Sequence, residues 1–242
     1  MSVTAKFLAH RTKTLTPEER SALESALIGT RELGGRVTLL RQGDSLSQST
    51  LVVEGLMGRY LDDRQGNRQL IALHLPGDFV DLHALPLTYL DHDVGTLTPA
   101  TIATFSHRGL REALDRVPSL WMKLWFSTMV DAAMHRQWVF RLGRLDALSR
   151  LANFMCELHL RFSAIGLASE NSFALPVTQN DIAEMCGLTH IHVNRVLRQL
   201  REEGLLEVRG GRVTLRDPAA MAQRGQFDPA YLYLDDAVVG AG

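Results

Sequence analysis

The feature that most constrains the fold is a glycine-centred pair of predicted helices within the segment 178–203. Thr178 and Asn180 are candidate N-caps for the first helix, and Thr189 is a good N-cap for the second. Gly187 stands between them and supplies the left-handed turn that ends one helix and lets the next begin. This spacing predicts a helix-turn-helix.

A β-hairpin is expected directly after the helix pair. Gly204 ends the second helix, and the apolar runs 205–208 and 213–215 flank the turn Arg209-Gly210-Gly211-Arg212. The second helix carries an apolar stripe made of Val193, Val196, Leu197 and Leu200. Two helices, a glycine turn and a hairpin predict a winged helix-turn-helix, which is much more specific than a helix pair. A winged helix used only for protein–protein contacts is the alternative.

The first half of the chain has a different texture. From residue 31 to residue 105, short apolar runs are separated by glycine-containing turns such as Pro76-Gly77-Asp78. Closely spaced strands of about five residues indicate a small β-barrel or a double-sheet roll. The strands are expected at 37–40, 51–53, 57–60, 70–75, 79–80 and 101–105. A short helix capped by Thr16, with residues 23, 27 and 28 on its apolar side, precedes them.

A long helix is predicted between these two regions, because no glycine or proline occurs between Pro118 and Gly143. Its first half is apolar on several sides, and includes Trp121 and Trp125. A helix of this kind needs a partner beyond its own domain, and a second copy is the economical choice. Burial within a monomer is the alternative. Gly143 is expected to end the helix, and another helix is expected over 146–162.

These features together resemble the Crp/Fnr superfamily of bacterial transcription regulators. The resemblance covers residues 16–216 and is strongest in Gln179–Ala183, in the spacing of Gly187, Thr189, Val193 and Arg195, and around Pro76–Phe79. It implies an α+β chain with a cyclic-nucleotide-binding-like β-roll, a long dimerisation helix and a C-terminal winged helix-turn-helix. The implied domains are a sensor roll at 1–117, a dimerisation helix at 118–143, a DNA-binding domain at 144–216 and a tail at 217–242.

The same resemblance points to residues that would contact DNA. The first residues of a recognition helix reach base edges in the major groove. Arg195 suits guanine, Asn194 suits adenine or a phosphate, and Ile191 suits a thymine methyl group. The full predicted set is Thr189, His190, Ile191, His192, Asn194, Arg195, Arg209 and Arg212, with the last two on the wing. The alternatives are a pairing of Arg195 with Glu202 and a solvated or structural role for each histidine.

The charge distribution is compatible with DNA binding. The formal net charge is −1, but residues 141–216 hold ten basic and eight acidic side chains, whereas residues 217–242 hold one basic and four acidic side chains. Phosphate binding depends on where the charges lie rather than on their total. The sequence has neither a membrane-spanning apolar run nor a signal-peptide core, so a cytoplasmic location is expected.

The roll lacks the groups that the resemblance requires for cyclic AMP. The family site uses a glutamate after the Gly-Asp-Phe turn and a later arginine, but at the glutamate position this chain has Leu82 or, with a one-residue slip, Asp81. No arginine lies between Arg68 and Arg108. We therefore expect no binding of cyclic AMP in the family manner, and no cofactor is predicted.

Several histidines and aspartates remain in this part of the roll. The candidate effector-binding residues are Asp81, His83, Asp91 and His92, with His74 and Asp93 nearby in the sequence. Imidazole and carboxylate groups are metal ligands, but the spacings match no standard zinc pattern, so no metal site is predicted. The alternatives are a pH-sensitive contact at His92, haem ligation by a histidine, or ordinary polar loop residues.

The cysteine content excludes two further kinds of site. Cys156 and Cys186 are too few for a disulfide framework or a four-cysteine iron–sulfur cluster, and both are expected to be buried. A cupin-like metalloenzyme is a rival from another class, but residues 31–75 contain only one histidine, His74. The expected function is therefore a non-enzymatic, homodimeric regulator that binds a pseudo-palindromic site in double-stranded DNA. RNA polymerase is a candidate partner.

Overall fold

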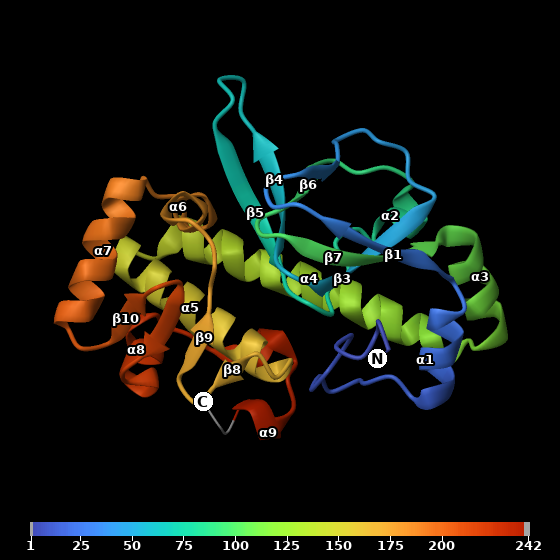
Figure 1. Cartoon of the computed structure of the whole chain (residues 1–242). Coiled ribbons are helices and arrows are strands. Elements are labelled where there is room, and N and C mark those ends of the chain that lie inside the picture. Colours follow the sequence, from blue (N-terminus) through green and yellow to red (C-terminus); the bar gives the residue numbers. More distant parts are fainter. Residues whose placement is uncertain (1, 240–242) are drawn as a thin grey trace. The chain divides into compact units, whose positions relative to one another are not determined.

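The computed structural model describes residues 2–239, which form two compact units. The first unit contains residues 13–132 with the described residues up to Ala9, and the second contains residues from 133 onward with residues 10–12. Helix α4 (Ser119–Arg144) begins in the first unit and ends in the second (Figure 1). Among the described residues, no helix has the length and apolar character required to cross a membrane.

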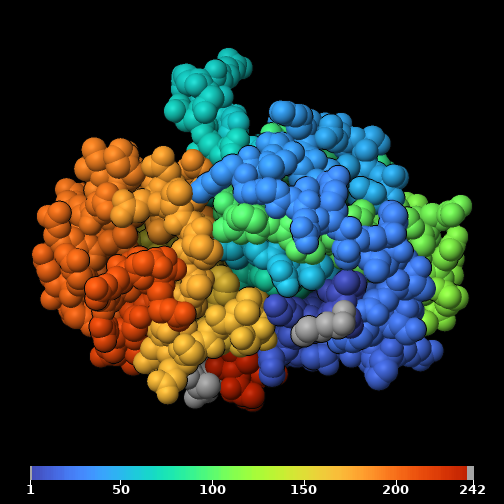
Figure 2. Space-filling view, in the orientation of Figure 1, coloured from blue at the N-terminus to red at the C-terminus, as the bar shows by residue number. Residues whose placement is uncertain are grey.

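The first unit is a double-sheet roll with short helices. One sheet has the order β1-β7-β3, the other has the order β2-β6-β4-β5, and neighbouring strands are antiparallel. The strands are β1 (Leu27–Leu33), β2 (Thr38–Leu40), β3 (Gln48–Glu54), β4 (Met57–Asp62), β5 (Arg68–His74), β6 (Asp93–Thr96) and β7 (Ala100–Ser106). The helices are α1 (Pro17–Glu24), α2 (Ala84–Leu87) and α3 (His107–Arg116). The turn between β4 and β5 projects from the surface (Figure 2).

Strand β7 shows how one sheet contributes to two cores. Ala103 and Phe105 belong to a core shared with α1, α3 and the first turns of α4. Ala100 and Ile102 belong to a second core, which lies between the two sheets. Successive side chains of a strand point to opposite faces, so this alternation lets the sheet pack against helices on one side and against strands on the other.

Three details of the first unit differ from the sequence-based expectation. Residues 27–28 begin β1 rather than extend the preceding helix, which ends at Glu24, because they enter the sheet beside β7. Residues 79–80 form no full strand: Phe79 makes an isolated bridge to Leu51, and the N–H of Val80 donates to the Thr50 carbonyl at 2.9 Å. Asp93 begins β6 instead of lying in a polar loop.

The second unit is a winged helix with additional C-terminal helices. Its sheet has the order β10-β11-β9-β8. The strands are β8 (Ala168–Ser169), β9 (Ser172–Ala174), β10 (Leu206–Arg209) and β11 (Arg212–Leu215). The helices are α5 (Ala147–Ala164), α6 (Gln179–Cys186), α7 (His190–Glu202), α8 (Pro218–Arg224), the 3-10 helix η1 (Pro229–Leu232) and α9 (Asp236–Val239). The expected order of helix, turn, helix and hairpin is therefore present.

The end of α4 differs from the expectation that Gly143 breaks it. The helix continues through Gly143 to Arg144, since a glycine inside a helix costs only about 1 kcal/mol relative to alanine. The break follows at Leu145 and Asp146. The Asp146 side chain caps α5 by accepting a hydrogen bond from the backbone N–H of Ser149 at 2.9 Å.

The C-terminal segment is part of the second unit. Leu232, Leu234 and Val238 pack on Leu160 and Ala164 of α5 in an apolar cluster. The segment 10–12 joins the same unit by backbone hydrogen bonds, from residue 12 to the carbonyl of residue 233 at 3.0 Å and from residue 235 to the carbonyl of residue 10 at 2.9 Å. Residues 217–239 thus add to the core that supports the winged helix.

Candidate functional site

The turn between α6 and α7 is fixed by local hydrogen bonds. The Thr178 hydroxyl accepts from the N–H of Asp181 at 3.2 Å, while the Asp181 carboxylate accepts from the N–H of Thr178 at 2.6 Å. This reciprocal capping box starts α6. Gly187 ends α6 in the left-handed region, with φ of +58°, and the Thr189 hydroxyl accepts from the N–H of His192 to start α7. The turn predicted from the sequence is therefore confirmed.

Arg150 of α5 stabilises the same turn through hydrogen bonds to backbone carbonyls. Its guanidinium donates to the carbonyl of Cys186 at 2.9 Å and to the carbonyl of Leu145 at 3.0 Å. Cys186 is the last residue of α6, and Leu145 directly follows α4. Arg150 thus supplies hydrogen-bond donors to carbonyls at the ends of two helices. Sequence reasoning did not identify Arg150, because its partner Cys186 lies 36 residues away in the sequence.

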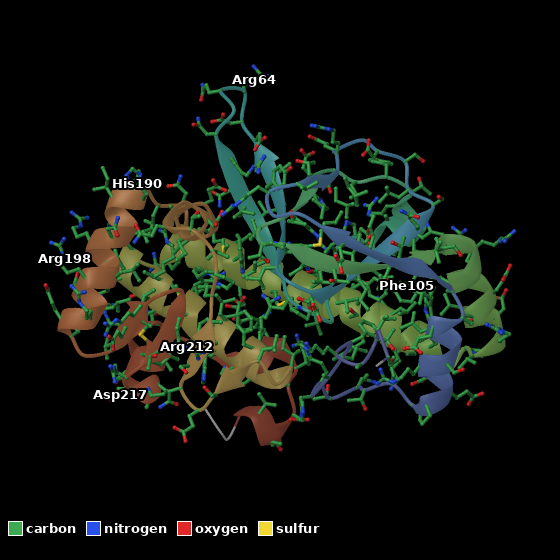
Figure 3. All side chains as sticks on the ribbon, in the orientation of Figure 1. Arg64, Phe105, His190, Arg198, Arg212 and Asp217 are labelled. Atoms are coloured by element: carbon green, nitrogen blue, oxygen red, sulfur yellow. The ribbon has the colours of Figure 1, made fainter. Side chains whose placement is uncertain are left out.

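Helix α7 has a buried face and an exposed face. Val193 and Leu200 are fully buried and Val196 nearly so, which fixes the rotation of the helix. Thr189, His190, Ile191, Asn194 and Arg195, all predicted to contact DNA, are exposed. Figure 3 shows His190 at the N-terminal end of α7 and Arg198 further along the helix, with its side chain directed away from the unit. A large aliphatic side chain such as Ile191, with 71% of its surface exposed, is suited to contact a thymine methyl group.

His192 differs from the other predicted residues because it is half-buried and contacts Arg195. Arg195 donates an Nη2–H to His192 Nε2 over 2.9 Å, so the imidazole accepts and carries its proton on Nδ1. Arg195 therefore contacts His192, which precedes it on α7, in place of the alternative partner Glu202 near the end of the same helix. The contact holds the guanidinium near the N-terminal end of α7, where base edges are read.

A shallow groove along α7 contains arginines that the sequence analysis did not select. Its lining residues are Gln179, Asn194, Leu197, Arg198, Arg201 and Val208. Arg198 and Arg201 are exposed and lie one and two turns beyond Asn194. Their helical spacing from Asn194 could have indicated that they lie near the same face. The sequence-based prediction considered only the first turns of the helix and therefore omitted them. Exposed cations beside the residues that are predicted to contact DNA are suited to phosphate oxygens.

The wing also presents exposed arginines. Strands β10 and β11 pair with Arg209 opposite Arg212, and the two glycines between them have φ of +56° and +74°. Like charges directly opposite in a sheet repel each other, and a bound anion such as a phosphate would offset this repulsion. Arg212 also donates to the Ser172 hydroxyl at 3.2 Å, which orients it.

The polar residues of the roll are only partly brought together. His83, Asp91 and His92 each offer a donor atom, and these three atoms lie within 4.8 Å of one another. Asp81 is not among them: its carboxylate is buried, accepts the N–H of Thr50 at 2.6 Å, and has a pKa raised by burial to about 7. The structure thus groups three of the four candidate effector residues.

The other two polar residues also lie outside this cluster. Asp93 accepts the N–H of Gln42 at 2.6 Å, and His74 is buried on β5. Leu82, which stands near the position of the family's ribose-binding glutamate, is buried in an apolar core.

A buried arginine lies beside the cluster. Arg59 on β4 donates from Nε to the carbonyl of Val80 at 2.7 Å and from Nη1 to Asp131 of α4 at 2.6 Å. Burial and the positive charge of Arg59 lower the pKa of His83 to about 4, so its imidazole is neutral at neutral pH. His92 Nδ1 lies 2.7 Å from the Asp91 carboxylate. Sequence reasoning considered only arginines after residue 68 and missed Arg59.

The two cysteines lie inside the second unit. Cys156 and Cys186 are both buried and unpaired. Burial raises the pKa of each thiol to about 12, so neither is a ready thiolate ligand.

The fold and these sites agree with comparisons to known proteins. Residues 149–224 match the Crp-like helix-turn-helix domain. The transcriptional activator protein FnrA of Stutzerimonas stutzeri is 29% identical over 203 residues, covering 84% of this chain and 83% of that protein. The fumarate and nitrate reduction regulatory protein of Escherichia coli (strain K12) is 25% identical over 210 residues, with coverages of 87% and 84%. The structure of FixK2 from Bradyrhizobium japonicum matches with a TM-score of 0.74 at 25% identity, covering 81% of this chain and 96% of that chain.

Proposed function

We propose that this chain acts as a homodimer that reads a pseudo-palindromic operator and responds to a signal through its β-roll. The chain belongs to the Crp/Fnr superfamily of DNA-binding transcription regulators. Its family consists of transcription regulators rather than enzymes. In this proposal residues 1–117 sense the signal, residues 118–143 dimerise and residues 144–216 bind DNA.

The observation that carries the proposal is the exposed N-terminal face of α7 above a buried apolar face. Arg195 would donate two hydrogen bonds to guanine, and Asn194 would pair with adenine or reach a phosphate. His190, Thr189 and the N-terminus of α7 would contact phosphate oxygens or a base edge. The wing arginines would hold the phosphate backbone. An interaction-only winged helix would have no need for this set of exposed cations.

Helix α4 supports the homodimer. Trp121, Met122, Trp125 and Met129 are each about half exposed in the first unit. Three of them recur every four residues and thus form a continuous strip along one side of the helix. Burial of a large apolar side chain contributes about 1.5–3 kcal/mol, so a second copy of the helix is the partner that this strip favours.

Selection of bound fragments from a random DNA pool tests the proposal. We expect enrichment of inverted repeats whose half-sites lie about 10 base pairs apart, one turn of DNA, or a multiple of that spacing. The selection is run on the purified chain with and without cell extract, so that a missing signal is supplied. Absence of enrichment under both conditions would overturn the proposal. Two relatives carry the name transcriptional activator, which favours activation, with RNA polymerase as partner, over repression.

A further inference from the structure

We propose that the β-roll binds one divalent transition-metal ion through His83, Asp91 and His92. The binding site is inferred from the roll alone. Its regulatory consequence rests on the function proposed above, because it makes this ion the signal that the roll senses.

The donor set carries the inference. His83 lies at the N-terminal end of α2, and Asp91 and His92 lie between α2 and β6. Their donor atoms lie within 4.8 Å of one another, and the two imidazole rings have centroids 5.3 Å apart. Two imidazoles and one carboxylate suit Zn²⁺, Fe²⁺, Co²⁺ or Ni²⁺ rather than Mg²⁺ or Ca²⁺. Metal bonds of about 2.0–2.2 Å require only a modest approach of the donors.

The exposure of the three residues gives the ion a route in. His92 is buried and His83 half-buried, while the Asp91 side chain is 84% exposed and can rotate toward the imidazoles. Three protein ligands leave at least one coordination position for water or a small molecule, as in open zinc sites.

The charges around the cluster accommodate a cation. Arg59 is the nearby positive charge, but its guanidinium is paired with Asp131 at 2.6 Å. Asp91 adds a negative charge on the solvent-exposed side of the cluster. Each of the neighbouring carboxylates Asp81 and Asp93 has one oxygen engaged outside the cluster, because Asp81 accepts from the N–H of Thr50 and Asp93 accepts from the N–H of Gln42.

Arg59 also links the cluster to α4. One side of its guanidinium bonds to the carbonyl of Val80, three residues before His83, and the other bonds to Asp131 of α4. An ion that fixes His83 would therefore act on a segment tied by one arginine to the proposed dimerisation helix. The two ends of this link lie in the same compact unit.

Metal titration of the full chain tests the site. The protein is stripped with a chelator, titrated with Zn²⁺ by calorimetry, and titrated with Co²⁺ while its visible absorption is followed. We expect one ion per chain and Co²⁺ absorption bands that report imidazole ligation. In His83→Gln and Asp91→Asn we expect affinity to fall at least about tenfold, since loss of a mere supporting contact to a metal ligand costs about 10–100-fold.

Two variants serve as matched controls. Asp93→Asn removes a neighbouring carboxylate outside the cluster, and His10→Gln removes an exposed histidine that pairs with Asp235 in the second unit. Both are expected to bind one ion with unchanged affinity. Circular dichroism verifies that each variant is folded. The site would be overturned if the wild-type chain failed to bind one ion, or if His83→Gln and Asp91→Asn bound the ion with the affinity of the wild type.

DNA binding separates this inference from the proposed function. With Zn²⁺ we expect the affinity of the wild-type chain for its selected DNA to change at least about fivefold, the lower end of ordinary allosteric coupling, and the affinity of His83→Gln to stay unchanged. An equal response in both chains would overturn the regulatory link. A chain that selects DNA but binds no ion contradicts the metal site and leaves the proposed function standing. A chain that binds one ion but selects no DNA contradicts the proposed function instead.

Discussion

Helix α4 is tied to each compact unit by a buried arginine, and the two arginines differ in their surroundings. In the roll, Arg59 pairs with Asp131, whose side chain remains 22% exposed. In the second unit, Arg141 of α4 contacts Glu157 at 3.1 Å and Asn153 at 3.2 Å, and both Arg141 and Glu157 are fully buried. The first contact is a partly exposed ion pair beside a polar cluster, and the second is part of a buried network of side chains.

The network around Glu157 gathers three elements of the second unit. Arg161 of α5 contacts Glu157 Oε1 at 3.4 Å. The Tyr231 hydroxyl donates to Glu157 Oε2 at 2.8 Å, the same oxygen that Arg141 contacts. A buried charge is tolerated only when it is paired and hydrogen-bonded, so every member of this network depends on the others. We therefore expect the DNA-binding end of α4 to be held firmly, and the roll end to rearrange more easily.

The largest expected effect is the loss of Glu157. Glu157→Gln leaves Arg141 and Arg161 buried without their carboxylate, and we expect the free energy of unfolding to fall by about 3–5 kcal/mol. Urea denaturation of the full chain measures this loss of stability. Tyr231→Phe is the matched control: it removes one hydrogen bond to the same carboxylate and should cost about 1.5–3 kcal/mol. A smaller effect of Glu157→Gln than of Tyr231→Phe would contradict the central place of Glu157 in this network.

The roll pair should be weaker. Asp131→Asn leaves Arg59 without its carboxylate at a site that is partly hydrated, and we expect a loss of about 1–3 kcal/mol, below the range for a fully buried pair. The control is Asp62→Asn, which breaks the exposed pair between Asp62 and Arg68 and should cost less than about 1 kcal/mol. If Asp131→Asn cost as much as Glu157→Gln, the two ends of α4 would be held equally and the comparison would fail.

On DNA, two arginines of α7 should give different kinds of loss. Arg195→Ala should cost about 1–3 kcal/mol on the selected site and relax the preference at one base pair. Arg198→Ala should weaken binding to all sequences equally and reduce the slope of log affinity against log salt by about 1. Fluorescence anisotropy at several salt concentrations measures both. Uniform weakening by Arg195→Ala would identify it as a phosphate contact.

The helix-turn-helix could be predicted from the sequence because its determinants are local. Thr178, Gly187 and Thr189 act on backbone groups within a few residues of themselves, so their chemistry is legible without the fold. Residues 27–28 show the opposite case: they continue the helical spacing of the preceding residues, but pairing with β7, more than 70 residues away, makes them a strand. Nothing near them in the sequence signals that partner.

The sites follow the same rule. The exposed face of α7 follows from helical periodicity, and all the residues predicted there except half-buried His192 are exposed. Arg59, Arg141 and Arg150 were missed because each is defined by a partner on another element, which the fold alone brings near. The grouping of His83 with Asp91 and His92 depends likewise on how the chain turns after α2, so spacing rules for metal ligands did not reveal it.

The smallest expected effect is the pH dependence of the Glu157 network. Burial alone would raise the pKa of Glu157, but Arg141 and Arg161 outweigh burial and hold that pKa below the usual value of 4.5. Because folding depresses the pKa, the stability that this carboxylate contributes is fully present above about pH 4.5 and is lost as the pH falls through the lower, folded value. The difference in unfolding free energy between wild type and Glu157→Gln should therefore be constant from neutral pH to about pH 5 and narrow below it. Urea denaturation of both proteins across this range measures the difference. A gap that begins to narrow well above the ordinary carboxyl pKa would mean that burial, rather than the two arginines, dominates at Glu157.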